Sequence, residues 1–201
     1  MKEASLLMLA YLIGGIPFGY LLVRLATGKD VRQFGSGNIG ATNVLRTTGR
    51  GAGVVTLLLD IAKGYAAVWL TGRFTEQSPL WISFAALAAM AGHAFPVFLR
   101  FQGGKAVASF VGAFLCLAPL PVGATAILFL TIVAITRYIS LGSVLGAGCF
   151  PLAVWLISHP AYEVLVASIA GSAFIIWRHR SNIQRLRAGK ENVFRFGGKK
   201  A

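Results

Sequence analysis

The sequence predicts an all-α, polytopic membrane protein with seven transmembrane helices, and three observations predict it. Of the 201 residues, 56% are hydrophobic and only 12% are charged, which is about half the charged share of a soluble domain. The apolar residues form runs as long as a helix needs to cross a bilayer. The 19 Lys and Arg residues, against 6 Asp and Glu, gather between those runs. Disorder is excluded because apolar residues abound, and a disulfide-stapled scaffold is excluded because there are only 2 cysteines.

The apolar runs predict the spans in chain order. The first three are residues 4–23, 51–72 and 77–99, and within the second we expect Asp60 and Lys63 to pair, because they lie three residues apart on one helical face. Residues 106–136 contain no charged side chain and would make one helix about 46 Å long, too long for a bilayer. Pro119 and Pro121 therefore predict two short spans, 106–118 and 121–136. Residues 143–157 and 161–177 complete the seven, and we expect residues 1–201 to form a single domain.

The positive charges predict the orientation of these spans. With the N-terminus outside, the inner segments are residues 24–50, 100–105, 137–142 and the tail from Arg178, and they hold 16 of the 19 Lys and Arg residues. Six spans would place the basic tail outside, against the positive-inside rule. The C-terminus is therefore expected to be cytoplasmic. This distribution assigns the net charge of +13 to inner loops rather than to nucleic acid binding.

The loop after the first span, FGSGNIGATNVLRTTGRG from Phe34 to Gly51, is dense in hydrogen-bonding groups. Its glycines allow backbone N–H groups to turn toward an anion, and a following helix N-terminus adds partial positive charge. The alternative is a flexible connector. A connector explains the glycines but not the polar side chains, which are Ser36, Asn38, Thr42, Asn43 and Arg46.

Two further inner segments share this character. Gly103, Gly104 and Lys105 precede a predicted helix, and such a loop can hold phosphate through its amides and ammonium. It is not a Walker A loop, because position 99 is Leu, and the alternative is a helix start with a snorkelling lysine. The tail, WRHRSNIQRLRAGKEN, places His179 and Asn182 among arginines, and its alternative interpretation is a cluster that contacts anionic lipid.

Together these segments predict a cationic, glycine-lined surface at the cytoplasmic interface, suited to a substrate that carries phosphate. Carboxylates are scarce there and the three histidines are scattered, so we expect neither a metal nor a cofactor. His93 is isolated in GHAFP, and its alternative role is a hydrogen bond between helices.

Four motifs carry a resemblance to a known family. SGNIGATNVLR (36–46), GHAFPVFLRFQGGKAVAS (92–109), RYISLGS (137–143) and RHRSNIQRLRAGKEN (178–192) closely resemble the bacterial membrane-integral glycerol-3-phosphate acyltransferases, the PlsY family. The resemblance extends over effectively the whole chain. The departures are Ala106, where the family motif has glycine, and Gln102, where lysine is common.

The resemblance implies transfer of a fatty acyl group from acyl phosphate to the 1-hydroxyl of glycerol-3-phosphate. The products are lysophosphatidic acid and inorganic phosphate, in the first acylation of bacterial phospholipid synthesis. The expected location is the cytoplasmic membrane with the active site at the cytoplasmic face. The expected partners are both substrates and membrane lipids, with the soluble enzyme that supplies acyl phosphate as a further candidate.

We expect direct attack without an acyl-enzyme, because an acyl phosphate is already activated and the sequence contains no G-x-S-x-G nucleophile elbow. The catalytic candidates are Ser36, Asn38, Lys105 and His179. The donor phosphate is expected in a cradle formed by Ser36, Gly37, Asn38, Gly40 and Thr42. Glycerol-3-phosphate is expected on Arg46, Lys105, His179 and Asn182, with Ser143 nearby, Gly103 and Gly104 in the loop of Lys105, and Asn43 serving either group.

Two questions stay open at this stage. The general base is His179, His93 or the donor's own phosphate. The alternative function is a membrane transporter of small phosphorylated anions, which the polar-poor outer loops and the absence of a visible inverted repeat disfavour.

Overall fold

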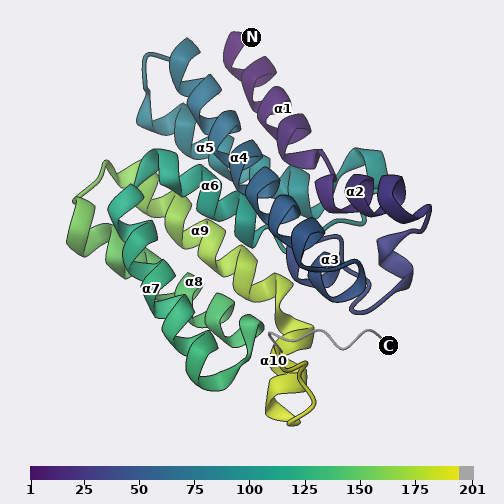
Figure 1. Cartoon of the computed structure of the whole chain (residues 1–201). Coiled ribbons are helices and arrows are strands. Elements are labelled where there is room, and N and C mark those ends of the chain that lie inside the picture. Colours follow the sequence, from purple (N-terminus) through teal and green to yellow (C-terminus); the bar gives the residue numbers. More distant parts are fainter. Residues whose placement is uncertain (195–201) are drawn as a thin grey trace. The chain divides into compact units, whose positions relative to one another are not determined.

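The computed structural model describes residues 1–194, and every regular element in that range is a helix (Figure 1). This confirms the all-α prediction. The chain folds into two compact units, the first from Met1 to Cys116 and the second beginning at Leu117. Three of the eight tail cations, Arg195, Lys199 and Lys200, lie outside the described residues.

The first unit is built on three mutually packed helices, α1 (Lys2–Gly15), α4 (Arg50–Phe74) and α5 (Pro79–Ala94). The first expected span, residues 4–23, lies within the apolar stretch Lys2–Thr27, but it consists of two helices, because α1 ends at Gly15 and α2 (Phe18–Thr27) begins after Pro17. Proline lacks an N–H and disfavours helical geometry in the residue before it. Ile16 accordingly has ψ 116°, outside the helical range.

Shorter elements connect these helices. The 3₁₀ turn η1 (Val31–Gln33) and helix α3 (Ala41–Thr47) lie between α2 and α4, and the 3₁₀ turn η2 (Val97–Leu99) follows α5. The segment from residue 34 to 51 thus contains a helix that the glycine-rich pattern did not predict. This helix, α3, has 7 residues, or about two turns; it contacts α4 and carries Arg46 in its last turn.

Helix α6 (Val107–Leu117) lies against α4 at two glycines. A Cβ on Gly64 would overlap the backbone of Ser109, and a Cβ on Gly112 would overlap the backbone of Ile61. Small residues allow such backbone contact between helices in a membrane. This contact holds the start of α6, and with it the loop that precedes α6, on the middle of α4.

The second unit contains α7 (Pro119–Thr136), α8 (Ile139–Ser158), α9 (Tyr162–Arg178) and α10 (Arg180–Arg187). Helix α8 packs on both α7 and α9, and α10 contacts α8 and α9. The predicted division of residues 106–136 is confirmed, but α7 starts at Pro119 rather than at 121, since proline suits the first helical turn. Helix α8 begins four residues earlier than the predicted span, so Ser143 lies inside it.

Five helical stretches in the described residues are long and apolar enough to cross a membrane. Large apolar side chains such as Leu58, Trp69 and Leu130 are exposed on them, as lipid contact requires. Helix α6 is apolar but has only 11 residues, about 16 Å of helix. The protein is therefore a multi-pass helical membrane protein, and the five stretches are Lys2–Thr27, Arg50–Phe74, Pro79–Leu99, Pro119–Thr136 and Ile139–Ser158.

The glycine contact between α4 and α6 gives a stability prediction. Gly64→Ala should lower the free energy of unfolding in detergent by about 1–3 kcal/mol, because the added methyl meets backbone that cannot rotate away. Gly51→Ala is the matched control on the same helix, since nothing lies within 4 Å of its Cβ position. Equal melting temperatures for the two variants would contradict the assigned contact.

Candidate active site

Asn43 organises the glycine-rich loop of the first unit. It is only 2% exposed, and its Oδ1 accepts a hydrogen bond from the Ser36 amide at 2.8 Å. Its Nδ2 donates to the carbonyls of Val31, Phe34 and Asn38 at 3.2, 3.1 and 2.8 Å. The amide of Asn43 therefore holds the loop closed, and its expected contact with a substrate phosphate stays a prediction.

The loop held by Asn43 presents Ser36 to solvent. Gly35 and Gly37 flank that serine with φ of +59° and +70°, a conformation that L side chains rarely adopt. Asn38 turns the chain by accepting the Gly40 amide on its Oδ1 at 2.8 Å. The structure thus brings together Ser36, Gly37, Asn38 and Gly40, with Asn38 half-buried and Ser36 exposed.

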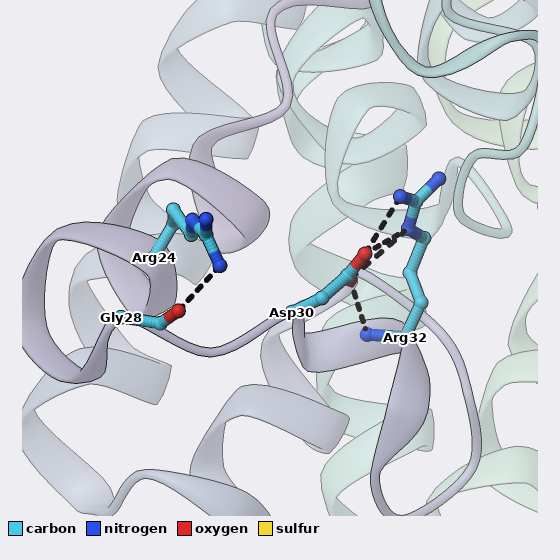
Figure 2. Close-up of polar contacts among 4 residues, drawn as sticks. All are labelled: Arg24, Gly28, Asp30 and Arg32. Atoms are coloured by element: carbon cyan, nitrogen blue, oxygen red, sulfur yellow. Dashed lines mark hydrogen bonds and ion pairs between the residues drawn. The ribbon is translucent and has the colours of Figure 1, made fainter.

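In the segment before this loop, two arginine side chains bond to groups of the same segment. Asp30 accepts two hydrogen bonds from Arg32 Nε, at 3.0 and 3.2 Å, and one from Arg32 Nη2 at 2.7 Å (Figure 2). The same figure shows Arg24 bonded to the Gly28 carbonyl. Hydrogen bonds from Arg32 lower the pKa of Asp30 and raise the pKa of the arginine itself. Both arginines therefore shape the loop, which leaves Arg46, exposed on α3, as the stronger candidate for an anion.

The second glycine loop is held against the end of α5. The Gly103 amide donates to the Ala94 carbonyl at 3.2 Å, and the Gly104 amide donates to the His93 carbonyl at 3.0 Å. The two amides therefore hold the loop on α5, and the expected contact of these glycines with phosphate stays a prediction. Lys105, half-buried, remains the phosphate candidate of this loop.

Ala106 joins Lys105 to α6 with φ +62° and is fully buried. A positive φ is unusual for a residue with a Cβ. Glycine, which the resemblance led us to expect at this position, would adopt this conformation without a Cβ penalty.

In the second unit, a carboxylate that sequence reasoning did not single out is the centre of the polar cluster. Glu191 Oε1 accepts from Asn182 Nδ2 at 2.7 Å and from Ser140 Oγ at 3.1 Å, and Oε2 accepts from Arg185 Nε at 2.8 Å. Burial raises the pKa of Glu191, but these three donors outweigh it and the pKa lies below its ordinary value. The signal in the sequence was that Glu191 is the only acidic residue in the basic tail.

His179 ends α9 and begins α10, 3% exposed. Its Nδ1 lies 2.8 Å from the Ile175 carbonyl oxygen. A carbonyl only accepts, so Nδ1 must carry the proton, and Nε2 is the acceptor nitrogen of the neutral ring. Ser143 is also buried and donates to the Ile139 carbonyl at 3.0 Å.

Apolar spans joined by glycine-rich loops that present Ser36, Arg46 and Lys105 define a membrane-integral protein that handles anionic groups. Among residues 1–194, no three His, Cys, Asp or Glu side chains gather as metal ligands would. The chain belongs to the glycerol-3-phosphate acyltransferase family, whose model matches residues 4–189.

Relatives and solved structures agree with this membership. The chain is 46% identical over 191 residues to a glycerol-3-phosphate acyltransferase of Desulforamulus reducens, covering 95% of this chain and 94% of the relative. It is 45% identical over 195 residues to one of Geobacter sulfurreducens, covering 97% and 99%. It resembles the crystal structure of PlsY, an integral membrane glycerol 3-phosphate acyltransferase, in its glycerol 3-phosphate form, with TM-score 0.91, 36% identity, and 97% and 96% of the two chains covered. The lysophosphatidic acid form of PlsY matches with TM-score 0.88, 34% identity and the same coverage, 97% and 96%.

The positive φ at Ala106 predicts that replacing this residue by glycine does not lower the free energy of unfolding. Ala106→Gly should keep or raise the free energy of unfolding, by up to about 1 kcal/mol, because glycine adopts this conformation without a Cβ penalty. Ala108→Gly, two residues on in α6, should lower it by about 1 kcal/mol because the residue is helical. Thermal unfolding in one detergent measures both, and a loss of equal size in the two variants would contradict the conformation assigned to Ala106.

Glu191 predicts an acid-dependent loss of stability. Its pKa is lowered in the fold, so its contribution is complete above the ordinary value of 4.5 and is lost as pH falls through the folded pKa. Glu191→Gln should be about 1–3 kcal/mol less stable at pH 7, with a shallower loss between about pH 5 and pH 3. Glu163→Gln, which removes a carboxylate from α9, is the control. Parallel acid curves for wild type and Glu191→Gln would show that another group senses the acid.

Proposed function

We propose that this protein is a glycerol-3-phosphate 1-O-acyltransferase that uses acyl phosphate as donor. The 1-hydroxyl oxygen of glycerol-3-phosphate forms a bond to the acyl carbonyl carbon, the bond from that carbon to the phosphate oxygen breaks, and the hydroxyl proton passes to a base. The products are lysophosphatidic acid and inorganic phosphate, the first acylated intermediate of phospholipid synthesis. The observation that carries this proposal is the family match over residues 4–189, which includes both glycine loops.

The donor phosphate is assigned to the loop organised by Asn43. This loop forms a turn whose backbone is fixed by the buried side-chain amide of Asn43. The residues proposed to contact the phosphate there are Ser36, Gly37, Asn38, Gly40 and Thr42. A preorganised turn needs little rearrangement when charge develops on the departing phosphate. Ser36 is proposed to contact the phosphate rather than to carry the acyl group, since an acyl phosphate already has a good leaving group.

Glycerol-3-phosphate is assigned to the cations of the first two motifs. Arg46, exposed on α3, and Lys105, half-buried just before α6, are proposed to bind its phosphate through charge-assisted hydrogen bonds. His179 and Asn182 are assigned to the same substrate by their motif, with Ser143 as a neighbour. The glycines of the second loop support Lys105 by donating their amides to carbonyls at the end of α5.

The proton acceptor is proposed to be His179 or the phosphate of the donor. The bond from His179 Nδ1 to the Ile175 carbonyl supports the first, because it leaves Nε2 as the acceptor in the neutral ring. The donor phosphate is the second, since it departs as the hydroxyl attacks and gains basicity in the same step.

We further propose seven spans in the bacterial cytoplasmic membrane, with the N-terminus outside and both glycine loops at the cytoplasmic face. The five long helices, short α6 and 17-residue α9 supply seven segments, and the placement of Lys and Arg supports the orientation. Membrane lipid and the soluble enzyme that makes acyl phosphate are the proposed partners. The family match, which runs from residue 4 to 189 without interruption, supports one acyltransferase domain.

One assay tests the reaction. Purified protein with palmitoyl phosphate and glycerol-3-phosphate should release phosphate and form lysophosphatidic acid in equal amounts, and only when both substrates are present. Lys105→Ala should raise the KM for glycerol-3-phosphate about 10–100-fold, the effect of one lost charge-assisted hydrogen bond. Lys2→Ala, which removes one positive charge from the exposed start of α1, should leave both constants unchanged.

Two outcomes would overturn parts of this proposal. A palmitoyl adduct trapped on Ser36 would replace direct attack with a covalent intermediate. Absence of phosphate release, with labelled glycerol-3-phosphate crossing liposomes that contain the protein, would replace acyl transfer with transport.

A further inference from the structure

A buried polar cluster in the first unit lies outside the residues assigned to substrates. Asp60 and Lys63 on α4 form an ion pair at 2.7 Å and are only 2% and 4% exposed. His93 on α5, 4% exposed, places its Nδ1 3.7 Å from Asp60 Oδ1 and 3.1 Å from Ser109 Oγ on α6. Three helices therefore meet at this cluster.

Part of the cluster has a structural explanation. Lys63 Nζ donates at 2.7 Å to the carbonyl of Ile16, which lies where Pro17 interrupts the first span. In a membrane a broken helix needs such a partner for its carbonyl. This accounts for Lys63 and for Asp60 as its counter-ion, but not for the histidine on the other side of Asp60.

His93 contacts the second glycine loop with both its backbone and its ring. Its carbonyl accepts the Gly104 amide at 3.0 Å. Its imidazole lies so close to Gly104 that a Cβ there would overlap Nε2 of the ring. A Cβ on Gly103 would likewise overlap the His93 carbonyl. The two glycines are thus required because the loop lies directly on this histidine.

The contacts of His93 bracket Lys105. On one side is Gly104, immediately before the lysine, and on the other is Ser109, four residues after it, in the first turn of α6. The same imidazole therefore contacts both ends of the segment that carries the ammonium group. The ring thus packs against the loop on one side and bonds to α6 on the other.

We infer that His93 is a positioning residue: anchored by Asp60 and Ser109, it holds the loop of Gly103 and Gly104 so that Lys105 can bind the phosphate of glycerol-3-phosphate. This inference rests on the proposed function, because it assigns the effect of His93 to that substrate. On this inference His93 acts through Lys105 rather than by taking the proton of the substrate hydroxyl, and the kinetic test below separates the two roles.

The first test separates positioning from proton transfer by kinetics. His93→Ala should raise the KM for glycerol-3-phosphate about 10-fold, leave kcat within about 3-fold, and leave the KM for palmitoyl phosphate unchanged. His93→Gln, whose amide can occupy the place of Nε2 but cannot act as a base near neutral pH, should restore the KM to within about 3-fold of wild type. Neither variant should remove a limb from the pH profile of kcat/KM.

The second test asks whether His93 acts through Lys105. In a double-mutant cycle, His93→Ala combined with Lys105→Ala should bind glycerol-3-phosphate as Lys105→Ala does, within about 2-fold, because the positioned group is already absent. Ser83→Ala is the matched control: it removes another buried polar group from α5, ten residues from His93, and should change no constant.

The outcomes distinguish the alternatives. A loss of about 100-fold or more in kcat for both His93 variants, with KM unchanged, would overturn the inference and make His93 the base. Multiplying effects in the double mutant would overturn action through Lys105. If His93→Ala fails to fold, His93→Gln and Ser109→Ala carry the same test. No phosphate release by wild type and Ser83→Ala would instead be a failure of the proposed function.

Discussion

Lys63 and Asp60 lie one turn apart on α4, buried among apolar helices, where each charge alone would be strongly unfavourable. The pair is tolerated there because each group has a second contact. Lys63 donates to the carbonyl exposed at the break of the first span, and Asp60 faces His93. Helices α1, α4, α5 and α6 are therefore tied by one polar cluster inside the membrane. The position of the second glycine loop depends on it.

Other polar residues of the protein also bond to groups of the fold itself. Both the oxygen and the nitrogen of the Asn43 side-chain amide bond to the backbone of the first loop, and Asp30 neutralises the charge of Arg32. In the second unit Glu191 joins Ser140 and Asn182, which come from α8 and α10. The fold thus gives hydrogen bonds of its own to several polar groups of the motifs, Asn182 included. The positive residues of such a protein therefore serve its proposed orientation and its loop structure as well as catalysis.

The prolines and glycines show which features of the fold could be predicted from the sequence. Pro119 ended α6 as predicted, since the effect of proline on a helix is local. Pro17 acts in the same way, yet the apolar run around it concealed the break. Gly103 and Gly104 were assigned to phosphate binding from their pattern, but they are required where the backbone lies on His93. A glycine pattern alone does not distinguish an anion site from a close contact between chain segments.

The sequence by itself determined the helical class, the order of the apolar segments, the placement of the charges between those segments and the family, because each follows from local composition or from contiguous motifs. Only the tertiary structure decided which polar residues are structural. Asn43 bonds to four residues 5 to 12 positions away, Ser140 lies 51 residues from Glu191, and Ile16 lies 47 residues from Lys63, and such hydrogen bonds have no periodic signature. The division between residues that build the loops and residues free to face a substrate is therefore a property of the fold.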